Sequence, residues 1–143
     1  GYNQDAWREY YTYGGLPFIL SFDTEQKKVN YLKSLFETVY LADIIERHNI
    51  KNENEMRELL LIIASSIGAP CNPTKLSNTF KSLKNVSIGS QTIANYLTYL
   101  AESFLLDKAI RYDIKGKKYI NTLAKFYFAD IGLRNAVLDM RQQ

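Results

Sequence analysis

The 143 residues suffice for one sizeable hydrophobic core or two small ones, and 46% hydrophobic with 23% charged residues is typical of a folded protein rather than a disordered one. The longest apolar run, residues 59–64, is too short to cross a bilayer, which argues against a membrane partner. One cysteine and one histidine exclude an intrachain disulfide and a four-ligand zinc site, and they favour a reducing, cytoplasmic compartment. The start at Gly1, without Met or a signal peptide, indicates a piece of a longer protein.

The net charge of +3 is distributed unevenly along the chain. Residues 1–70 contain 7 Lys+Arg and 10 Asp+Glu, whereas residues 71–125 contain 9 Lys+Arg and 3 Asp+Glu. This asymmetry suggests a polyanionic partner for the basic second half.

The first 50 residues predict an aromatic-rich helical segment and then a long helix. Glycine and proline at 14–17 separate the two, because Gly frees φ and Pro restricts it. Thr24 is the expected N-cap of the long helix, which should fade in the polar stretch 48–54. Its apolar positions recur every three or four residues, at Val29, Leu32, Phe36, Val39 and Tyr40.

The next helix has a capping box at its start, where Asn52 can accept from the backbone and Glu55 can reach back. Gly68 and Pro70 should end it. Its expected buried positions are Met56, Leu59, Leu60, Ile63 and Ile67.

Two further helices are predicted after residue 71. The first has Asn72 as its cap and Pro73 in its first turn, and the second has Ser90 as its cap. Their expected buried faces are Leu76, Phe80 and Leu83 for the first, and Ile93, Leu97, Leu100 and Phe104 for the second.

The apolar period changes to two after residue 107, which is typical of a half-buried strand through Ile110, Tyr112 and Ile114. A turn at 115–118 leads into a return strand, and a short helix is expected from about Ile131. We therefore expect a mainly α protein whose second half is a winged helix-turn-helix with a small hairpin wing.

Two interpretations of the basic half remain open. As a DNA-binding module, it would place amides and hydroxyls of the helix from Ser90 at base edges and lysines at phosphates. As a structural or protein-interaction linker, it would need neither, and the absence of Lys and Arg from 90–107 with Glu102 on the polar side favours this alternative. The candidate DNA contacts are Gln91, Thr92 and Asn95 for bases, and Lys75, Lys81, Lys84, Lys115, Lys117 and Lys118 for phosphates.

No complete catalytic site is found in the sequence. A phosphate-binding loop of the Walker type is missing, and the single histidine has no nucleophile motif around it. Asp43 and Arg47 are four residues apart on a predicted helix, a spacing typical of a surface ion pair.

Five stretches together resemble a large group of prokaryotic AAA-superfamily ATPases. In that group a P-loop domain is followed by a helical lid, a winged helix and a nuclease-like domain. The stretches occur here in the expected order. They are Tyr13-Gly14-Gly15-Leu16-Pro17, Asp43-Ile44-Ile45-Glu46-Arg47, Tyr96-Leu97-x-x-Leu100, Arg111-Tyr112-Asp113-Ile114-Lys115-Gly116-Lys117-Lys118 and Lys125-Phe126-Tyr127-Phe128-Ala129-Asp130-Ile131-Gly132-Leu133-Arg134-Asn135.

The resemblance implies that residues 1–67 are the lid region and residues 72–143 the winged-helix domain. The P-loop domain, which would bind ATP and Mg²⁺, would precede Gly1, and the nuclease-like domain would follow Gln143. This chain itself would bind no cofactor. Arg47, with Asp43 in the same Asp-x-x-x-Arg element, would be a candidate for a position near the nucleotide phosphates. Family members often have an acidic residue where this chain has Phe18, so a role that needs this carboxylate is not expected here.

Overall fold

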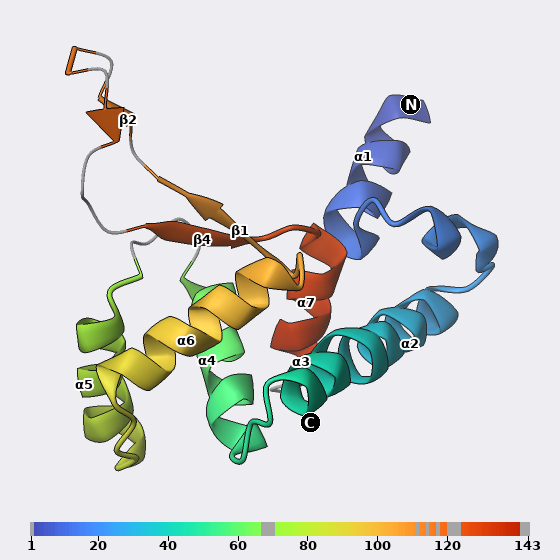
Figure 1. The fold of residues 1–143 in the computed structure, drawn as a ribbon. Coiled ribbons are helices and arrows are strands. Elements are labelled where there is room, and N and C mark those ends of the chain that lie inside the picture. The colour runs from blue at the N-terminus through green and yellow to red at the C-terminus, as the bar shows by residue number, and fades with distance from the viewer. Residues whose placement is uncertain are drawn as a thin grey trace. The chain divides into compact units, whose positions relative to one another are not determined.

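The computed structural model describes residues 2–66, 71–110, 112–113, 115–116, 118–119 and 124–140. It is mainly helical, as predicted (Figure 1). The chain divides into two compact units: unit 1 consists of Gly1–Glu53 and Phe128–Gln143, and unit 2 of Asn54–Tyr127. Unit 2 is thus inserted in the sequence of unit 1. The predicted boundary between residues 67 and 72 differs from this division, which groups the end of the chain with its beginning.

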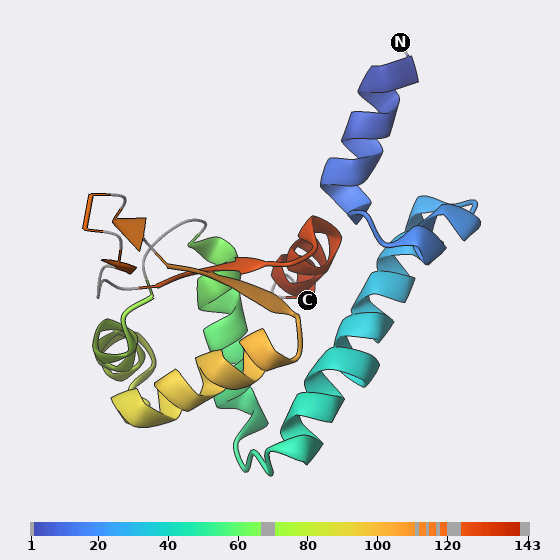
Figure 2. The same cartoon turned by 45° about the horizontal axis from the view of Figure 1, so that its top comes forward.

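Unit 1 is helical, and its last helix packs against helices from the start of the chain. Helix α7 contacts both α1 and α2 (Figure 2). The Thr24 side chain accepts a hydrogen bond from the Lys27 N–H at 3.3 Å, which confirms the predicted cap of α2. The elements are α1 (Tyr2–Tyr13), the 3₁₀ helix η1 (Pro17–Ser21), α2 (Glu25–Leu35), the π-helical η2 (Phe36–Leu41), α3 (Ala42–Arg47) and α7 (Ile131–Met140).

The long helix predicted from Thr24 contains a π-helical segment that changes its buried face. The Ala42 N–H bonds the Glu37 carbonyl, five residues earlier, so η2 has one residue more per turn than an α-helix. Beyond Phe36 the buried positions therefore continue at Leu41 and Ile44. Val39, predicted to be buried, is 54% exposed. The prediction was wrong there because a fixed 3.6-residue period cannot anticipate a π-turn.

Unit 2 combines helices with short paired strands. Strand β1 pairs with β4, and β2 pairs antiparallel with β3 in a register that places Tyr112 opposite Tyr119 and Asp113 opposite Lys118. Lys115 and Gly116 of the predicted turn lie between these paired strands, as expected for a hairpin, whereas Lys118 belongs to β3. The elements are α4 (Glu53–Ser65), α5 (Pro73–Lys84), α6 (Ser90–Glu102), β1 (Leu106–Ala109), β2 (Tyr112–Asp113), β3 (Lys118–Tyr119) and β4 (Lys125–Phe128).

Helix α5 begins as predicted. The Asn72 side chain accepts hydrogen bonds from the N–H groups of Thr74 and Lys75 at 2.9 and 3.3 Å. Leu76 and Phe80 are buried, but Leu83 is 75% exposed, so its predicted place in the core was wrong. Leu83 lies in the last turn of α5, two residues before Asn85, which reverses the chain in the left-handed conformation (φ 52°).

Helix α6 differs from the prediction at both ends. Gly89, not Ser90, is the N-cap residue, and it makes no side-chain cap bond. At the other end Phe104 has φ 61° and is 79% exposed, whereas it was predicted to be buried. The left-handed residue turns the chain, so Leu105 and Leu106 occupy the buried positions instead. The remaining predicted core residues of α6, which are Ile93, Leu97 and Leu100, are confirmed.

Helix α4 supplies much of the core of unit 2. Four of its five predicted positions are buried, and Ala64 is buried beside them. Residues 67–70, with the predicted helix stop, lie outside the described part of the chain. The confirmed core positions of α4 are Met56, Leu59, Leu60 and Ile63.

In the ranges that the structure covers, we find no helix with the length and apolar character needed to cross a bilayer.

Candidate functional site

The outward side of α6 is a row of polar side chains. Ile93, Leu97 and Leu100 face the core, and with 3.6 residues per turn this leaves a polar row on the other side. The members of this row are all exposed, as predicted: Gln91, Asn95, Thr98 and Glu102. Thr92, the remaining candidate for a base contact, lies outside the row and is partly exposed.

Two of the amides proposed to contact bases are engaged with each other. Gln91 Nε2 donates to Asn95 Oδ1 at 3.1 Å, one helical turn away. Reading a base with either amide would require this exposed bond to exchange for bonds to the base, which costs little at a solvated surface.

The lysines of α5, the helix that precedes α6 in the sequence, are exposed. Lys75 and Lys81 project to solvent, whereas Lys84 Nζ lies 3.4 Å from the Glu58 carboxylate of α4. The neighbouring carboxylate reduces the net charge that Lys84 can offer to a phosphate. Lys75 and Lys81 are therefore the stronger phosphate candidates on this helix.

The hairpin places one of its three candidate lysines at the turn. Lys115 and Gly116 are exposed in the turn between β2 and β3. Lys118 belongs to β3, so it is a strand residue rather than a turn residue, and Lys117 lies outside the described residues. The prediction that Lys118 belongs to the turn was therefore wrong.

Two exposed lysines on the paired strands were not among the predicted contacts. Lys108 on β1 and Lys125 on β4 are exposed on strands that pair with each other. The pairing of these two strands joins segments about 17 residues apart in the sequence, so local pattern could not show it. The alternation of exposed Lys125, buried Phe126 and exposed Tyr127 was the one available signal.

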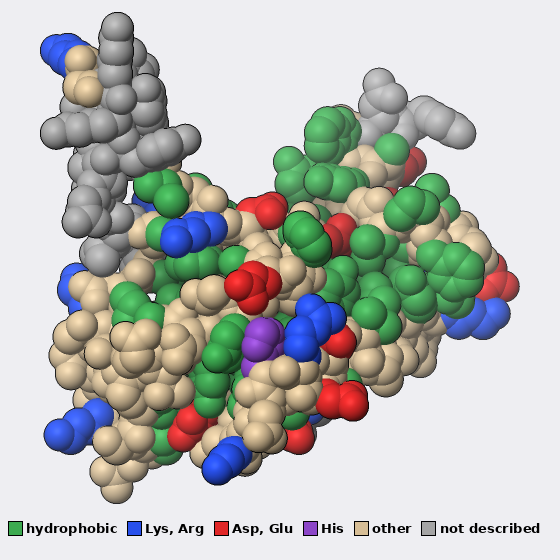
Figure 3. All heavy atoms as spheres, viewed as in Figure 1, with side chains coloured by type: hydrophobic (Ala, Val, Ile, Leu, Met, Phe, Trp, Pro, Cys, Tyr) green, Lys and Arg blue, Asp and Glu red, His purple; other side chains and the backbone are tan. Residues whose placement is uncertain are grey.

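The division into units sharpens the charge asymmetry. Unit 2 contains ten Lys and Arg against five Asp and Glu, whereas unit 1 contains eight against ten. On the face drawn in Figure 3, the cationic side chains that the structure describes in unit 2 occur at separate places. Such spacing is suited to several individual phosphate contacts.

Asp43 and Arg47 form the ion pair that their spacing indicates. Arg47 Nη2 lies 2.6 Å from Asp43 Oδ2 on α3, and both side chains are about half exposed. Pairs of this kind stabilise a helix by only about 0.3–0.5 kcal/mol. The pair leaves Arg47 accessible, and its position relative to a nucleotide stays a prediction.

The first and last motifs of the resemblance meet in unit 1. The Asp130 carboxylate accepts from the Gly15 N–H at 2.8 Å and from the Leu133 N–H at 3.1 Å. One oxygen of this carboxylate therefore caps α7, and the other binds the loop after α1. We call Gly14, Gly15, Asp130 and Gly132 the clasp.

The glycines of the clasp are needed because the backbones approach closely. A Cβ on Gly14, whose φ is +81°, would lie 2.1 Å from Asp130 Oδ1. A Cβ on Gly132 would lie 2.0 Å from the Tyr13 carbonyl oxygen. Any larger residue would separate α1 from α7, so these motif residues have a structural explanation.

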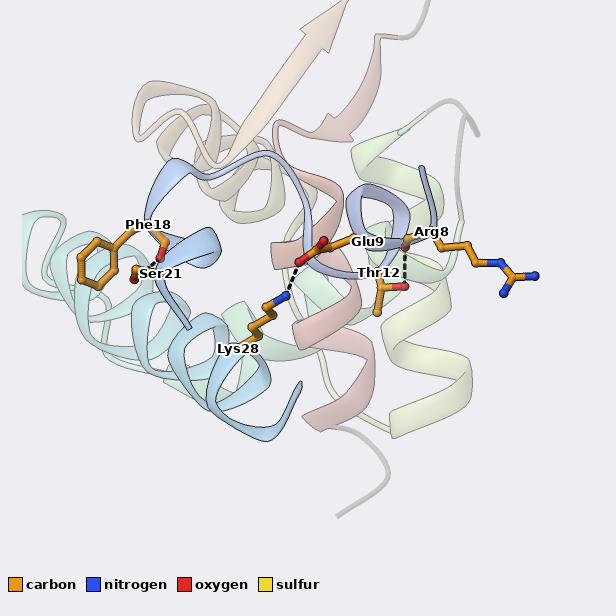
Figure 4. A network of polar contacts seen from close by, with 6 residues as sticks. All are labelled: Arg8, Glu9, Thr12, Phe18, Ser21 and Lys28. Carbon is orange, nitrogen blue, oxygen red and sulfur yellow. Dashed lines mark hydrogen bonds and ion pairs between the residues drawn. The ribbon is translucent and has the colours of Figure 1, made fainter. Parts of the chain in front are cut away.

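A charged contact joins α1 to α2 beside the clasp. Figure 4 shows Glu9 and Lys28 pointing toward each other, and the two form an ion pair. Lys28 Nζ also lies 5.0 Å from the centre of the Tyr13 ring. Burial, followed by the nearby charge of Glu25, raises the pKa of Tyr13, so its hydroxyl stays protonated at neutral pH.

The metal-ligating side chains of the described residues do not gather into a cluster. No group of three His, Cys, Asp or Glu is placed to hold a metal ion in the residues that could be searched. Burial raises the pKa of Cys71, which keeps its thiol protonated and weakly nucleophilic.

Comparison with known proteins identifies the family to which this chain belongs. An uncharacterised protein of Haemophilus influenzae is 39% identical over 126 residues, which are 88% of this chain and 31% of that protein. An uncharacterised protein of Methanocaldococcus jannaschii is 29% identical over 122 residues, or 85% of this chain and 27% of that protein. The chain thus spans about a third or less of the length of these relatives, and no solved structure matches it. A family model matches residues 4–143, so the chain belongs to the family described as "Domain of unknown function (DUF8612)".

Proposed function

We propose that the chain is the non-catalytic lid and winged-helix portion of an AAA-superfamily ATPase, and that its unit 2 binds DNA weakly through phosphate contacts. The observation that carries the DNA proposal is the excess of positive charge in unit 2, with exposed lysines on α5 and on the strands around α6. Phosphate contacts supply affinity without reading sequence.

The order of elements in unit 2 supports a winged helix. Helices α4, α5 and α6 are followed by β1 and β4, which pair, and by the hairpin of β2 and β3. In such a module α6 would enter the major groove and the hairpin would follow the backbone. Because α6 has no Lys or Arg, its contribution would come from Gln91, Thr92 and Asn95.

The ATPase proposal rests on the ordered motifs and on the length of the relatives. The relatives extend far beyond the matched residues, which leaves room for a nucleotide-binding domain and a nuclease-like domain in a longer polypeptide. ATP and Mg²⁺ would bind to that P-loop domain, and Arg47 would approach the phosphates from the lid. The Asp43 carboxylate would hold Arg47 until a phosphate competes for it.

A specific observation favours the alternative, an interdomain linker that binds no nucleic acid. The exposed row of α6 contains the acidic Glu102, and two of its amides bond each other. A carboxylate on the helix that approaches DNA repels phosphates.

Salt-dependent fluorescence anisotropy with a labelled duplex separates the two functions. If three or four lysines contact phosphates, the slope of log K against log salt should be about −3 to −4. Replacing Lys75 and Lys81 by Ala should make the slope less steep and weaken all sequences equally. The matched control replaces Lys27 and Lys51 of unit 1, with the same change in net charge, and should leave the slope nearly unchanged. No binding at low salt would refute DNA binding and support the linker.

A further inference from the structure

The outward face of α1 exposes three large aromatic side chains. Trp7, Tyr10 and Tyr11 are 59%, 47% and 58% exposed, and their spacing of three and four residues places them on one side of the helix. Their rings contact each other, with centroids 5.7–6.1 Å apart. We call these three residues the aromatic face. A cluster of exposed rings of this size usually marks an interaction surface.

The apolar surface continues past the end of α1. A Cβ on Gly15 would lie 3.2 Å from the Tyr10 ring, so the loop after α1 runs directly beside the aromatic face. In the following η1, Phe18 and Leu20 are also mostly exposed. Figure 3 shows hydrophobic side chains gathered over this part of unit 1. The surface is therefore larger than one helix face.

A cavity of about 330 Å³ adjoins the aromatic face, since Tyr11 lines it. The cavity lies between α1, α2 and α7, and Val29, Leu32 and Ala136 supply apolar walls. Its volume is sufficient for one large apolar side chain of a partner.

The polar side chains that α7 contributes to this cavity already have partners within unit 1. Asn135 Nδ2 donates to the carbonyls of Tyr11 and Thr12 at 2.8 and 3.1 Å. The Asp139 carboxylate forms an ion pair with Lys33 at 2.7 Å. A polar ligand would have to break these bonds, so the lining favours an apolar occupant.

We propose that the aromatic face and this cavity form a docking surface for another part of a longer polypeptide that contains this chain. The relatives provide the partner, because more than two thirds of their length lies outside the matched residues. The docked segment inserts one large apolar side chain into the cavity and covers the ring of Trp7. The aromatic face itself contains no charged side chain, so it suits an uncharged partner surface better than a polyanion.

This inference rests on the proposed function only in treating the chain as part of a longer protein, and it does not depend on DNA binding. Trp7 is the only tryptophan of the chain, so its fluorescence reports directly on the aromatic face. We would measure quenching by acrylamide in the 143-residue chain and in the longer protein, with every other tryptophan of the latter replaced by Phe. The expected result is a several-fold smaller quenching constant in the longer protein, with emission at shorter wavelength.

Two variants of the longer protein test the surface itself. Tyr11→Ser, at the edge of the cavity, should restore quenching of Trp7 toward that of the short chain. Leu83→Ser, which removes an exposed apolar side chain from unit 2, is the matched control and should leave Trp7 protected. Circular dichroism on each variant verifies that the helices remain folded.

Two results would overturn the proposal. Equal quenching of Trp7 in the short and long proteins would show that no other part of the polypeptide covers the face. Protection that appears in the short chain as its concentration rises, together with a dimer in sedimentation, would assign the face to a second copy. The anisotropy titration judges DNA binding separately, so either proposal can fail while the other stands.

Discussion

Unit 1 and unit 2 are stabilised in different ways. Unit 2 is one continuous stretch of sequence, and apolar positions at helical spacing account for most of its core. Unit 1 joins two stretches separated by all of unit 2, and close backbone contact at Gly14 and Gly132 allows α1 and α7 to pack. The core of unit 2 therefore follows local periodicity, whereas the packing of α1 on α7 in unit 1 also requires glycines at positions that have no room for a side chain.

The largest effect is expected from Gly132→Ala. The added Cβ would overlap the Tyr13 carbonyl oxygen, so α7 must shift from α1 at a cost of about 3 kcal/mol. Denaturant unfolding measures this cost. The control Gly89→Ala has 3.9 Å to its nearest neighbour, Thr92 Oγ1, and should change the unfolding free energy far less. An equal loss of unfolding free energy in the two variants would show that the close backbone contact in the clasp does not stabilise the protein.

A smaller loss is expected from Asp130→Ala. The variant leaves the N–H groups of Gly15 and Leu133 without the carboxylate, which should destabilise unit 1 by about 1–3 kcal/mol. Hydrogen exchange at the amides of α1 and α7 should increase, while exchange in α5 and α6 stays unchanged. A uniform increase across both units would contradict the separation between them.

Asn72→Ala tests the side-chain cap of α5 in unit 2. Loss of the bonds to Thr74 and Lys75 should cost about 1 kcal/mol. The expected consequence is faster amide exchange at the start of α5, with the clasp unaffected. Asn72→Asp, which keeps an accepting oxygen, should restore most of the lost stability.

The smallest effect is expected from Arg47→Ala, which removes an exposed ion pair with Asp43. The free energy of unfolding should fall by about 0.3–0.5 kcal/mol, which corresponds to a decrease in melting temperature of about one or two degrees. In the longer protein, the proposed position near a nucleotide predicts that ATP turnover falls much more than stability does. Normal turnover per folded molecule would leave Arg47 with a structural role alone.

Helix positions and most of their ends were predictable from the sequence. The caps at Thr24 and Asn72 are confirmed, because a capping side chain bonds the backbone two or three residues away. The polar row of α6 is exposed as expected for the same local reason. Two lysines of the candidate surface, Lys108 and Lys125, were missed because strand pairing brings their strands together.

The errors arose where the backbone departs from regular geometry. Val39 follows the start of a π-turn, and Phe104 adopts a positive φ that only glycine and a few other residues favour. Leu83 lies at the end of α5, two residues before the left-handed Asn85. A periodic pattern assumes a constant rotation per residue, so each of these departures changes which side chains are buried.

The mainly helical class, the caps and the charge asymmetry follow from residues that are close together in the chain, so they could be predicted from the sequence. The contact of Gly14 and Gly132 with opposite ends of unit 1, and the grouping of the last helix with the first, became known from the folded chain alone. Their contact spans more than 110 residues, and it depends on shape complementarity between two backbones. Local propensity contains no information about such an encounter, since its energy comes from packing that exists only once both helices are in place.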